Sequence, residues 1–214
     1  MIAKSLSPRR FHCFQLSLLA CVALASTSFA RPIFFAVDST PYDRQMTRVQ
    51  PILAAIDPQV TDEISVAVVN QWMNRVRRIP YRYSKQWQTP DEVSLRRAAD
   101  CKGKAMFLYE IMRQMGATDV RLVIGRHRAG DWFTHAWLEW ETASGSYVLD
   151  PTFSRRAVRM ERQSPTRYIP LYAYEGELRY RAQNPSVPAE NPPRAVAAGQ
   201  QTWAMPSQGF TGLE

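Results

Sequence analysis

The chain has 214 residues, of which 45% are hydrophobic and 21% charged, and its formal net charge is +8. At this length one domain with a single hydrophobic core is expected, and the sequence shows no internal repeats. The positive charge is moderate and no nucleic-acid recognition motif accompanies it, which excludes nucleic acid as a partner.

Residues 1–30 have the pattern of a secretory signal peptide: basic residues, an apolar run over 14–25, and a stretch of small residues that ends at Ala30. The apolar run is shorter than the roughly 20 residues that a membrane-spanning helix needs. We therefore expect a periplasmic or secreted protein. The alternative is a lipoprotein cleaved before Cys21, because Leu18–Cys21 resembles a lipobox; membrane attachment is expected only in that case.

The rest of the chain divides by composition into three parts. Residues 31–60 are rich in proline and predict an irregular lead-in with at most one short helix. Residues 61–182 carry regular apolar patterns and are expected to form the main folded domain. Residues 183–214 are rich in Pro, Asn, Gln and Ala with scarcely any apolar pattern, which predicts a disordered tail.

Three helices are predicted in the main domain. Apolar residues at three- and four-residue steps indicate a helix over 61–77. Thr89 followed by Pro90 indicates the start of a short helix. Asp100 is expected to cap a third helix, which ends before Gly116 and whose apolar stripe comprises Cys101, Ala105, Leu108, Met112 and Met115.

Three strands are predicted after these helices, over residues 120–124, 134–140 and 147–150. The connections between them are short and contain Gly, Ser and Asp, so consecutive antiparallel pairing is the simplest topology. The sequence therefore predicts an α+β fold, in which helices pack on an antiparallel sheet.

Cys101 is the only cysteine outside the predicted signal peptide, and it opens the third helix. Cysteines of exported proteins tend to be paired in disulfides, so a single thiol at a helix start suggests a chemical role. Only the thiolate attacks well, and the first turn of a helix favours negative charge. The alternative is that Cys101 is a small core residue without reactivity.

His135 and Asp150 are candidate partners of this thiol. Because side chains alternate along a strand, His135 shares a face with Trp137 and can point towards the helix start. Asp150 ends the next strand, where its carboxylate can orient the imidazole as the third member of a triad does. A structural histidine and a turn-forming aspartate are the alternatives. His127 is the competing base, expected in a loop.

Three sequence blocks together resemble the transglutaminase-like superfamily. Cys101 stands in Asp-Cys-Lys-Gly-Lys-Ala, His135 in His-Ala-Trp-Leu-Glu, and Asp150 in Leu-Asp-Pro-Thr, in the order of the family's three motifs. The upstream strings Val-Asn-Gln-Trp-Met-Asn-Arg-Val and Trp-Gln-Thr-Pro-Asp-Glu are similar to the lead-in of the bacterial transglutaminase-like cysteine proteinases, which are exported. The resemblance covers about residues 64–153.

The resemblance implies a papain-like or transglutaminase-like core and acyl transfer through Cys101, His135 and Asp150. It also implies an oxyanion donor in the preceding segment, for which Trp87 and Gln88 are candidates. We expect a cysteine peptidase or amidase that acts on a protein or peptide of the cell envelope. The alternatives are a protein-glutamine transglutaminase and a catalytically silent binding domain of the same fold.

The resemblance also implies that acidic residues beside the nucleophile bind calcium. Asp100 matches this pattern, whereas Lys102 and Gly103 stand where further acids are expected. This departure argues against a calcium requirement, so we expect no cofactor. A zinc site is not expected either, because one cysteine with His135 and Asp150 supplies only three dispersed ligands.

Overall fold

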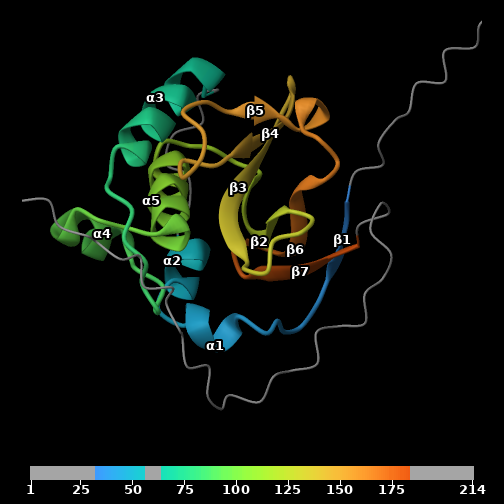
Figure 1. Ribbon diagram of the computed structural model, residues 1–214, viewed down its shortest axis with the longest axis horizontal. Coiled ribbons are helices and arrows are strands. Elements are labelled where there is room, and N and C mark those ends of the chain that lie inside the picture. Colours follow the sequence, from blue (N-terminus) through green and yellow to red (C-terminus); the bar gives the residue numbers. More distant parts are fainter. Residues whose placement is uncertain (1–31, 56–63, 184–214) are drawn as a thin grey trace, which may run out of the picture.

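The computed structural model describes residues 32–55 and 64–183 (Figure 1). The predicted signal peptide, Cys21 and the predicted tail from residue 184 onward lie outside these residues. After one strand come the helices and then the other strands. Their order is β1 (Ile33–Ala36), α1 (Asp43–Met46), α2 (Gln50–Ala55), α3 (Val66–Arg77), α4 (Pro90–Arg96), α5 (Cys101–Gln114), β2 (Val120–Arg128), β3 (His135–Thr142), β4 (Gly145–Leu149), β5 (Val158–Arg159), the 3-10 helix Met160–Arg162, β6 (Arg167–Glu175) and β7 (Leu178–Gln183).

The strands form one seven-stranded antiparallel sheet in the order β1-β7-β6-β2-β3-β4-β5. The predicted consecutive pairing is confirmed, because β2 pairs with β3 and β3 with β4. The strand predicted to end at Ile124 continues to Arg128, with an irregularity in its pairing with β6 after Ile124. The α+β class is therefore confirmed.

Helix α5 lies on one face of the sheet, where it packs on β2 and β3 and against α3 and α4 (Figure 1). The apolar stripe of α5 faces the sheet residues Ala136 and Leu138 in the main core. Met115, the last residue of the predicted stripe, is instead half exposed. Burial of this face is the main source of stability, as in other domains of two packed layers.

The other face of the sheet carries a smaller apolar cluster. Val123, Trp137, Val148 and Ala173 are all buried there, and aromatic side chains such as Tyr168 pack against them. Trp137 belongs to this cluster while its neighbours Ala136 and Leu138 belong to the main core, as the alternation along β3 predicts.

Local capping signals fix the ends of α4 and α5. Thr89 forms a capping box with Glu92 at the start of α4, and Pro90 occupies its first turn. Asp100 caps α5 by accepting from the backbone N–H of Gly103 at 3.1 Å. Gly116 follows the helix with φ of 95°, in the left-handed region expected there. Each of these predicted helix ends is confirmed.

Two boundary predictions were wrong. The first long helix begins at Val66 rather than at residue 61, because the Ser65 hydroxyl accepts from the Val68 N–H and residues 64 and 65 are not helical. The segment predicted to be an irregular lead-in contains β1, α1 and α2. Met46 and Leu53 from this segment are buried in the main core, so apolar packing outweighs its proline content.

Strands β6 and β7 were not predicted from the sequence, although β6 pairs with β2 at the centre of the sheet. Within the described ranges, none of the helices has the length and apolar character needed to cross a membrane.

Candidate active site

Cys101 is the first residue of α5 and carries a free, half-buried thiol. Its position follows from the Asp100 cap, which starts the helix directly before it. Backbone N–H groups in the first helical turn have no acceptor within the helix, and the helix dipole adds partial positive charge there. A thiolate at this position is therefore stabilised by the backbone.

His135 lies between Cys101 and Asp150. Its Nε2 atom is 2.8 Å from an Asp150 carboxylate oxygen, and the nearby Cys101 side chain also raises the pKa of its ring. Because Asp150 engages Nε2, Nδ1 is the ring nitrogen left for the sulfur. His135 is the first residue of β3 and stacks over Trp137 with ring centroids 6.1 Å apart. Although Trp137 lies on the face away from α5, the strand end lets the imidazole reach the helix start.

The surroundings of His135 favour its protonated form. Burial alone disfavours the imidazolium, but the hydrogen bonds with Asp150 and Cys101 outweigh burial and raise the pKa of His135 to about 9. The side chain is only 8% exposed, so solvent screens these interactions weakly. An imidazolium beside a sulfur stabilises the thiolate, which is the attacking species.

Asp150 follows β4 and is fully buried. Burial would raise its pKa, but the hydrogen bond with His135 and two others lower it below the usual value. These two donors are the Thr152 backbone N–H at 2.9 Å and the Tyr168 hydroxyl at 3.0 Å. The carboxylate is thus held ionised and in one orientation, which in turn fixes the imidazole.

Tyr168 is a site residue that sequence analysis missed. It lies on β6 with φ of 52°, an uncommon conformation for a bulky residue. Its hydroxyl binds Asp150, and its ring packs edge-on against Trp137 with centroids 5.4 Å apart. The sequence around residue 168 shows no strand pattern that would have drawn attention to it. The hydroxyl reaches the site because β6 pairs with β2, which is known only from the folded structure.

His127 lies near the site but is occupied otherwise. The prediction that it lies in a loop was wrong, because β2 extends through it. An Arg167 guanidinium nitrogen is 2.8 Å from its Nε2, and its ring stacks on Phe153 with centroids 4.4 Å apart. Burial and then the Arg167 charge lower the pKa of His127, so the neutral imidazole accepts from Arg167. The ring centroids of His127 and His135 are 5.7 Å apart. Among the described contacts His127 makes no hydrogen bond with Cys101.

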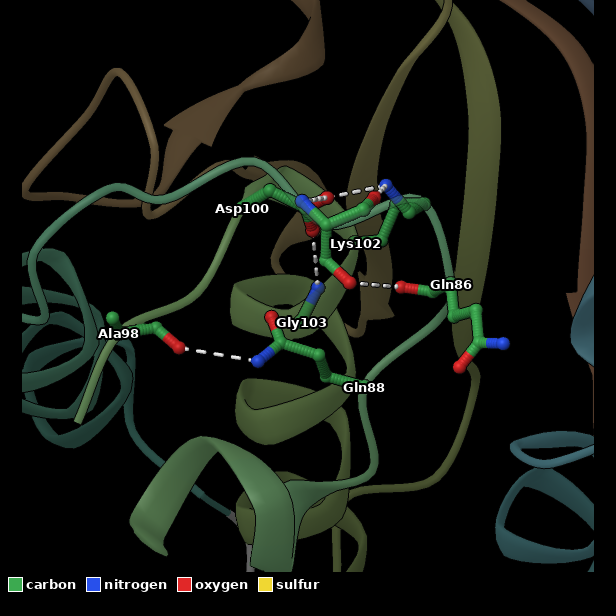
Figure 2. Close-up of polar contacts among 7 residues, drawn as sticks. Gln86, Gln88, Ala98, Asp100, Lys102 and Gly103 are labelled. Atoms are coloured by element: carbon green, nitrogen blue, oxygen red, sulfur yellow. Dashed lines mark hydrogen bonds and ion pairs between the residues drawn. The ribbon is translucent and has the colours of Figure 1, made fainter. Parts of the chain in front are cut away.

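The two candidate oxyanion donors differ in their contacts. Gln88 is buried, and its amide nitrogen donates to the Ala98 carbonyl oxygen at 3.2 Å, so this side chain links two backbone segments beside α5 (Figure 2). Trp87 is also buried, at 2% exposure, and its indole N–H finds no acceptor among the described residues. Trp87 therefore retains a free donor, whereas Gln88 has a structural contact.

Two exposed aromatic side chains, Phe153 and Tyr81, lie near the candidate site, and two more are close to it in the sequence. Phe153 is 53% exposed and lies 5.0 Å from the His135 ring, centroid to centroid. Trp132, which is 96% exposed, and Phe133 immediately precede β3 in the chain. Tyr81 is exposed too, and burial together with the nearby charge of Cys101 raises its pKa to about 12. Exposed rings such as those of Phe153 and Tyr81 are typical of binding surfaces.

A lysine ammonium, rather than further carboxylates, contacts Asp100 next to Cys101. Within residues 32–55 and 64–183, no three His, Cys, Asp or Glu side chains gather closely enough to hold an ion. The Lys102 ammonium contacts the Asp100 carboxylate, where calcium would need further oxygen ligands. A side chain at Gly103 would be crowded, because its Cβ would lie 3.0 Å from both Ala99 Cβ and Gln88 Oε1.

No family model and no curated protein sequence matches this chain. Among solved structures, LapG of Legionella pneumophila in an EGTA-treated form gives a TM-score of 0.49 at 14% identity, over 70% of this chain and 82% of LapG. Calcium-bound LapG gives 0.48 at 14% identity, over 65% and 80% of the two chains. A protein of Cytophaga hutchinsonii, provisionally named a cysteine protease, gives 0.35 at 13% identity, over 67% and 53%.

The TM-scores of these matches are all below 0.5. At such identities and TM-scores they establish no activity, substrate or metal for this chain. The expected arrangement, a cysteine at the start of a helix that packs on an antiparallel sheet, is present in the chain's own coordinates.

Proposed function

We propose that this chain is an exported cysteine peptidase or amidase that hydrolyses amide bonds through Cys101, His135 and Asp150. One observation supports this most: a single buried imidazole hydrogen-bonds a buried carboxylate, and the only described thiol is near enough to help raise the pKa of that imidazole. Its pKa, raised to about 9, favours an imidazolium beside the sulfur at neutral pH. A structural histidine would need neither the thiol nor a carboxylate with three hydrogen-bond donors.

In the proposed reaction the Cys101 sulfur attacks the carbonyl carbon of the substrate amide, and a carbon–sulfur bond forms. The His135 imidazolium gives its proton to the leaving nitrogen, the carbon–nitrogen bond breaks, and the amine departs from a thioester. His135, now neutral, then takes a proton from water as the water attacks the thioester. The acid leaves, and the ion pair of Cys101 and His135 is restored.

The negative charge on the tetrahedral oxygen needs donors that are in place before the reaction. We propose the Cys101 backbone N–H and the Trp87 indole N–H for this role. The first is available in the opening turn of α5, and the second is buried without an acceptor among the described residues. Loss of one such donor typically costs about two to three orders of magnitude in rate.

A polypeptide of the cell envelope fits the surface around the proposed nucleophile. The exposed rings of Tyr81, Trp132, Phe133 and Phe153 can contact side chains on both sides of the scissile bond. The proposed periplasmic or secreted location rests on residues 1–30 of the sequence. If a lysine amine replaces water as the acceptor, the same residues catalyse transamidation.

Acylation by 4-nitrophenyl acetate tests the proposed nucleophile. The purified protein is expected to release a burst of nitrophenolate equal to its content of Cys101, and Cys101→Ala is expected to fold normally and give none. Asp91→Asn, a change at an exposed site on α4, is the matched control and should keep the burst. A burst of normal size from Cys101→Ala would refute the assignment.

Incubation with unfolded casein, followed by mass spectrometry, distinguishes the acceptors. Hydrolysis yields shorter peptides, whereas transamidation yields cross-linked species with loss of ammonia. Labelling with iodoacetamide at about pH 6 separates an enzyme from a silent binding domain, because a core cysteine stays unlabelled until the protein unfolds. We expect Cys101 to react at this pH and His135→Ala to abolish the reaction.

A further inference from the structure

Lys102 lies at the centre of a polar cluster beside the proposed nucleophile (Figure 2). Its ammonium contacts the Asp100 carboxylate, donates to the Ser84 backbone carbonyl at 3.0 Å, and lies 5.2 Å from the centroid of the Tyr83 ring. The side chain is only 18% exposed, and the Asp100 side chain is fully buried. The contacts of Lys102 therefore lie largely out of water, where they are strong.

Asp100 is a buried carboxylate that needs this charge. It accepts from the Gly103 N–H at 3.1 Å, from the Ser84 N–H at 3.2 Å and from Lys102. A buried carboxylate is costly unless it is both paired and hydrogen-bonded. The helix dipole helps, but Lys102 supplies the only full positive charge that the described contacts place on this carboxylate.

The same cluster ties the segment 80–84 to the start of α5. The Arg82 N–H donates to the Ala99 carbonyl at 3.1 Å, and the Ala99 N–H donates to the Pro80 carbonyl at 3.1 Å. Lys102 and Asp100 extend this link to Ser84, so the chain that leads to Trp87 is held against the residue before Cys101. The position of the proposed oxyanion donor therefore depends on the cluster.

We propose that Lys102 is a positioning residue whose ammonium serves as a built-in cation at this place, so that the site needs no divalent metal ion. The ammonium holds a carboxylate and a backbone carbonyl together, which are the ligand types that a calcium ion takes. The crowding that a side chain at Gly103 would meet supports the same conclusion. The expected effect of Lys102 on catalysis rests on the proposed function, whereas its effect on stability does not.

The test compares the protein with Lys102→Met, which keeps the aliphatic stem but removes the charge, and with Lys102→Arg, which keeps a cation. Lys85→Met is the control, because Lys85 lies in the same segment but is exposed. We expect Lys102→Met to lower the thermal unfolding midpoint by about 5–10 °C and the rate of Cys101 acylation by at least about tenfold. Lys102→Arg should recover part of both, and Lys85→Met should change neither.

Calcium titration of the unmodified protein gives an independent measurement. Neither millimolar calcium chloride nor excess EGTA is expected to move the unfolding midpoint or the acylation rate. An EGTA-induced loss that calcium restores would overturn the inference, and so would a Lys102→Met protein equal to the unmodified one. Thermal unfolding midpoints can be measured without catalytic turnover. The inference about Lys102 can therefore fail while the proposed function holds, and the proposed function can fail while the inference about Lys102 holds.

Discussion

Replacing Asp150 by Asn should lower the pKa of His135 by more than two units. In the unmodified protein, burial lowers this pKa, and the hydrogen bonds and charges of Asp150 and Cys101 raise it to about 9 against an ordinary value of 6.5. A difference of this size corresponds to about 3 kcal/mol in favour of the imidazolium. The Asn side chain keeps the shape but removes the charge, which leaves Cys101 as the only group that opposes burial, so the pKa should fall to about the ordinary value of 6.5.

Proton NMR titration of the imidazole can measure this change directly, because the sequence has only three histidines. At pH 7 His135 should be charged in the unmodified protein and largely neutral in Asp150→Asn. Asp91→Asn is again the control and should leave the titration unchanged. If His135 still titrates near pH 9 in Asp150→Asn, the carboxylate is not the source of the raised pKa, and the proposed charge arrangement fails.

The same shift predicts how stability depends on pH. The pKa of His135 is higher in the folded protein than in the unfolded chain, so the stabilisation is complete below about pH 6.5 and is lost as the pH rises through about 9. The free energy of unfolding, measured by urea denaturation, should fall by about 3 kcal/mol over this window. In Asp150→Asn this fall should be absent, and an unchanged fall would contradict the linkage.

Three further substitutions test individual contacts. Tyr168→Phe removes one hydrogen-bond donor to Asp150 but keeps the ring. The kcat, measured as nitrophenolate release, should therefore fall by about threefold to tenfold. A loss of kcat as large as that of Asp150→Asn would contradict this expectation. Gly125→Ala should lower the free energy of unfolding in urea by about 3 kcal/mol or more. The alanine Cβ would collide with a carbonyl oxygen of β6 and lie 2.8 Å from Pro170 Cα. Near-normal stability of this variant would refute the close packing of Gly125 against β6. Thr89→Ala should cost about 1 kcal/mol through loss of the α4 cap, with little change in acylation; an unchanged unfolding free energy would show that the cap contributes nothing.

Features that depend on local sequence were predictable. Thr89 and Asp100 cap helices through bonds to residues three positions away, and short turns join strands that are adjacent in the chain. The candidate residues Cys101, His135 and Asp150 were found because a helix start and two strand ends are such local features. The structure joins His135 and Asp150 by a hydrogen bond, with Cys101 among the groups that raise the pKa of His135; the catalytic role of the three residues stays a prediction.

Features that depend on distant parts of the chain were not predictable. Strand β6 contains Pro170, which a single-sequence pattern disfavours at the centre of a sheet, yet its pairing with β2 places Tyr168 on Asp150. The proline-rich segment before residue 56 forms helices because the main core buries Met46 and Leu53, a contact made only after folding. His127 was assigned to a loop because its charged neighbours hide the continuation of β2.

The two outermost strands of the sheet are its shortest, with four residues in β1 and two in β5. An open row of unpaired backbone groups is a template on which a second molecule can add its own strand. Here each border offers very few such groups, and Arg159 places a charge on one of them. We therefore expect the folded molecule to resist edge-to-edge self-association even at high concentration.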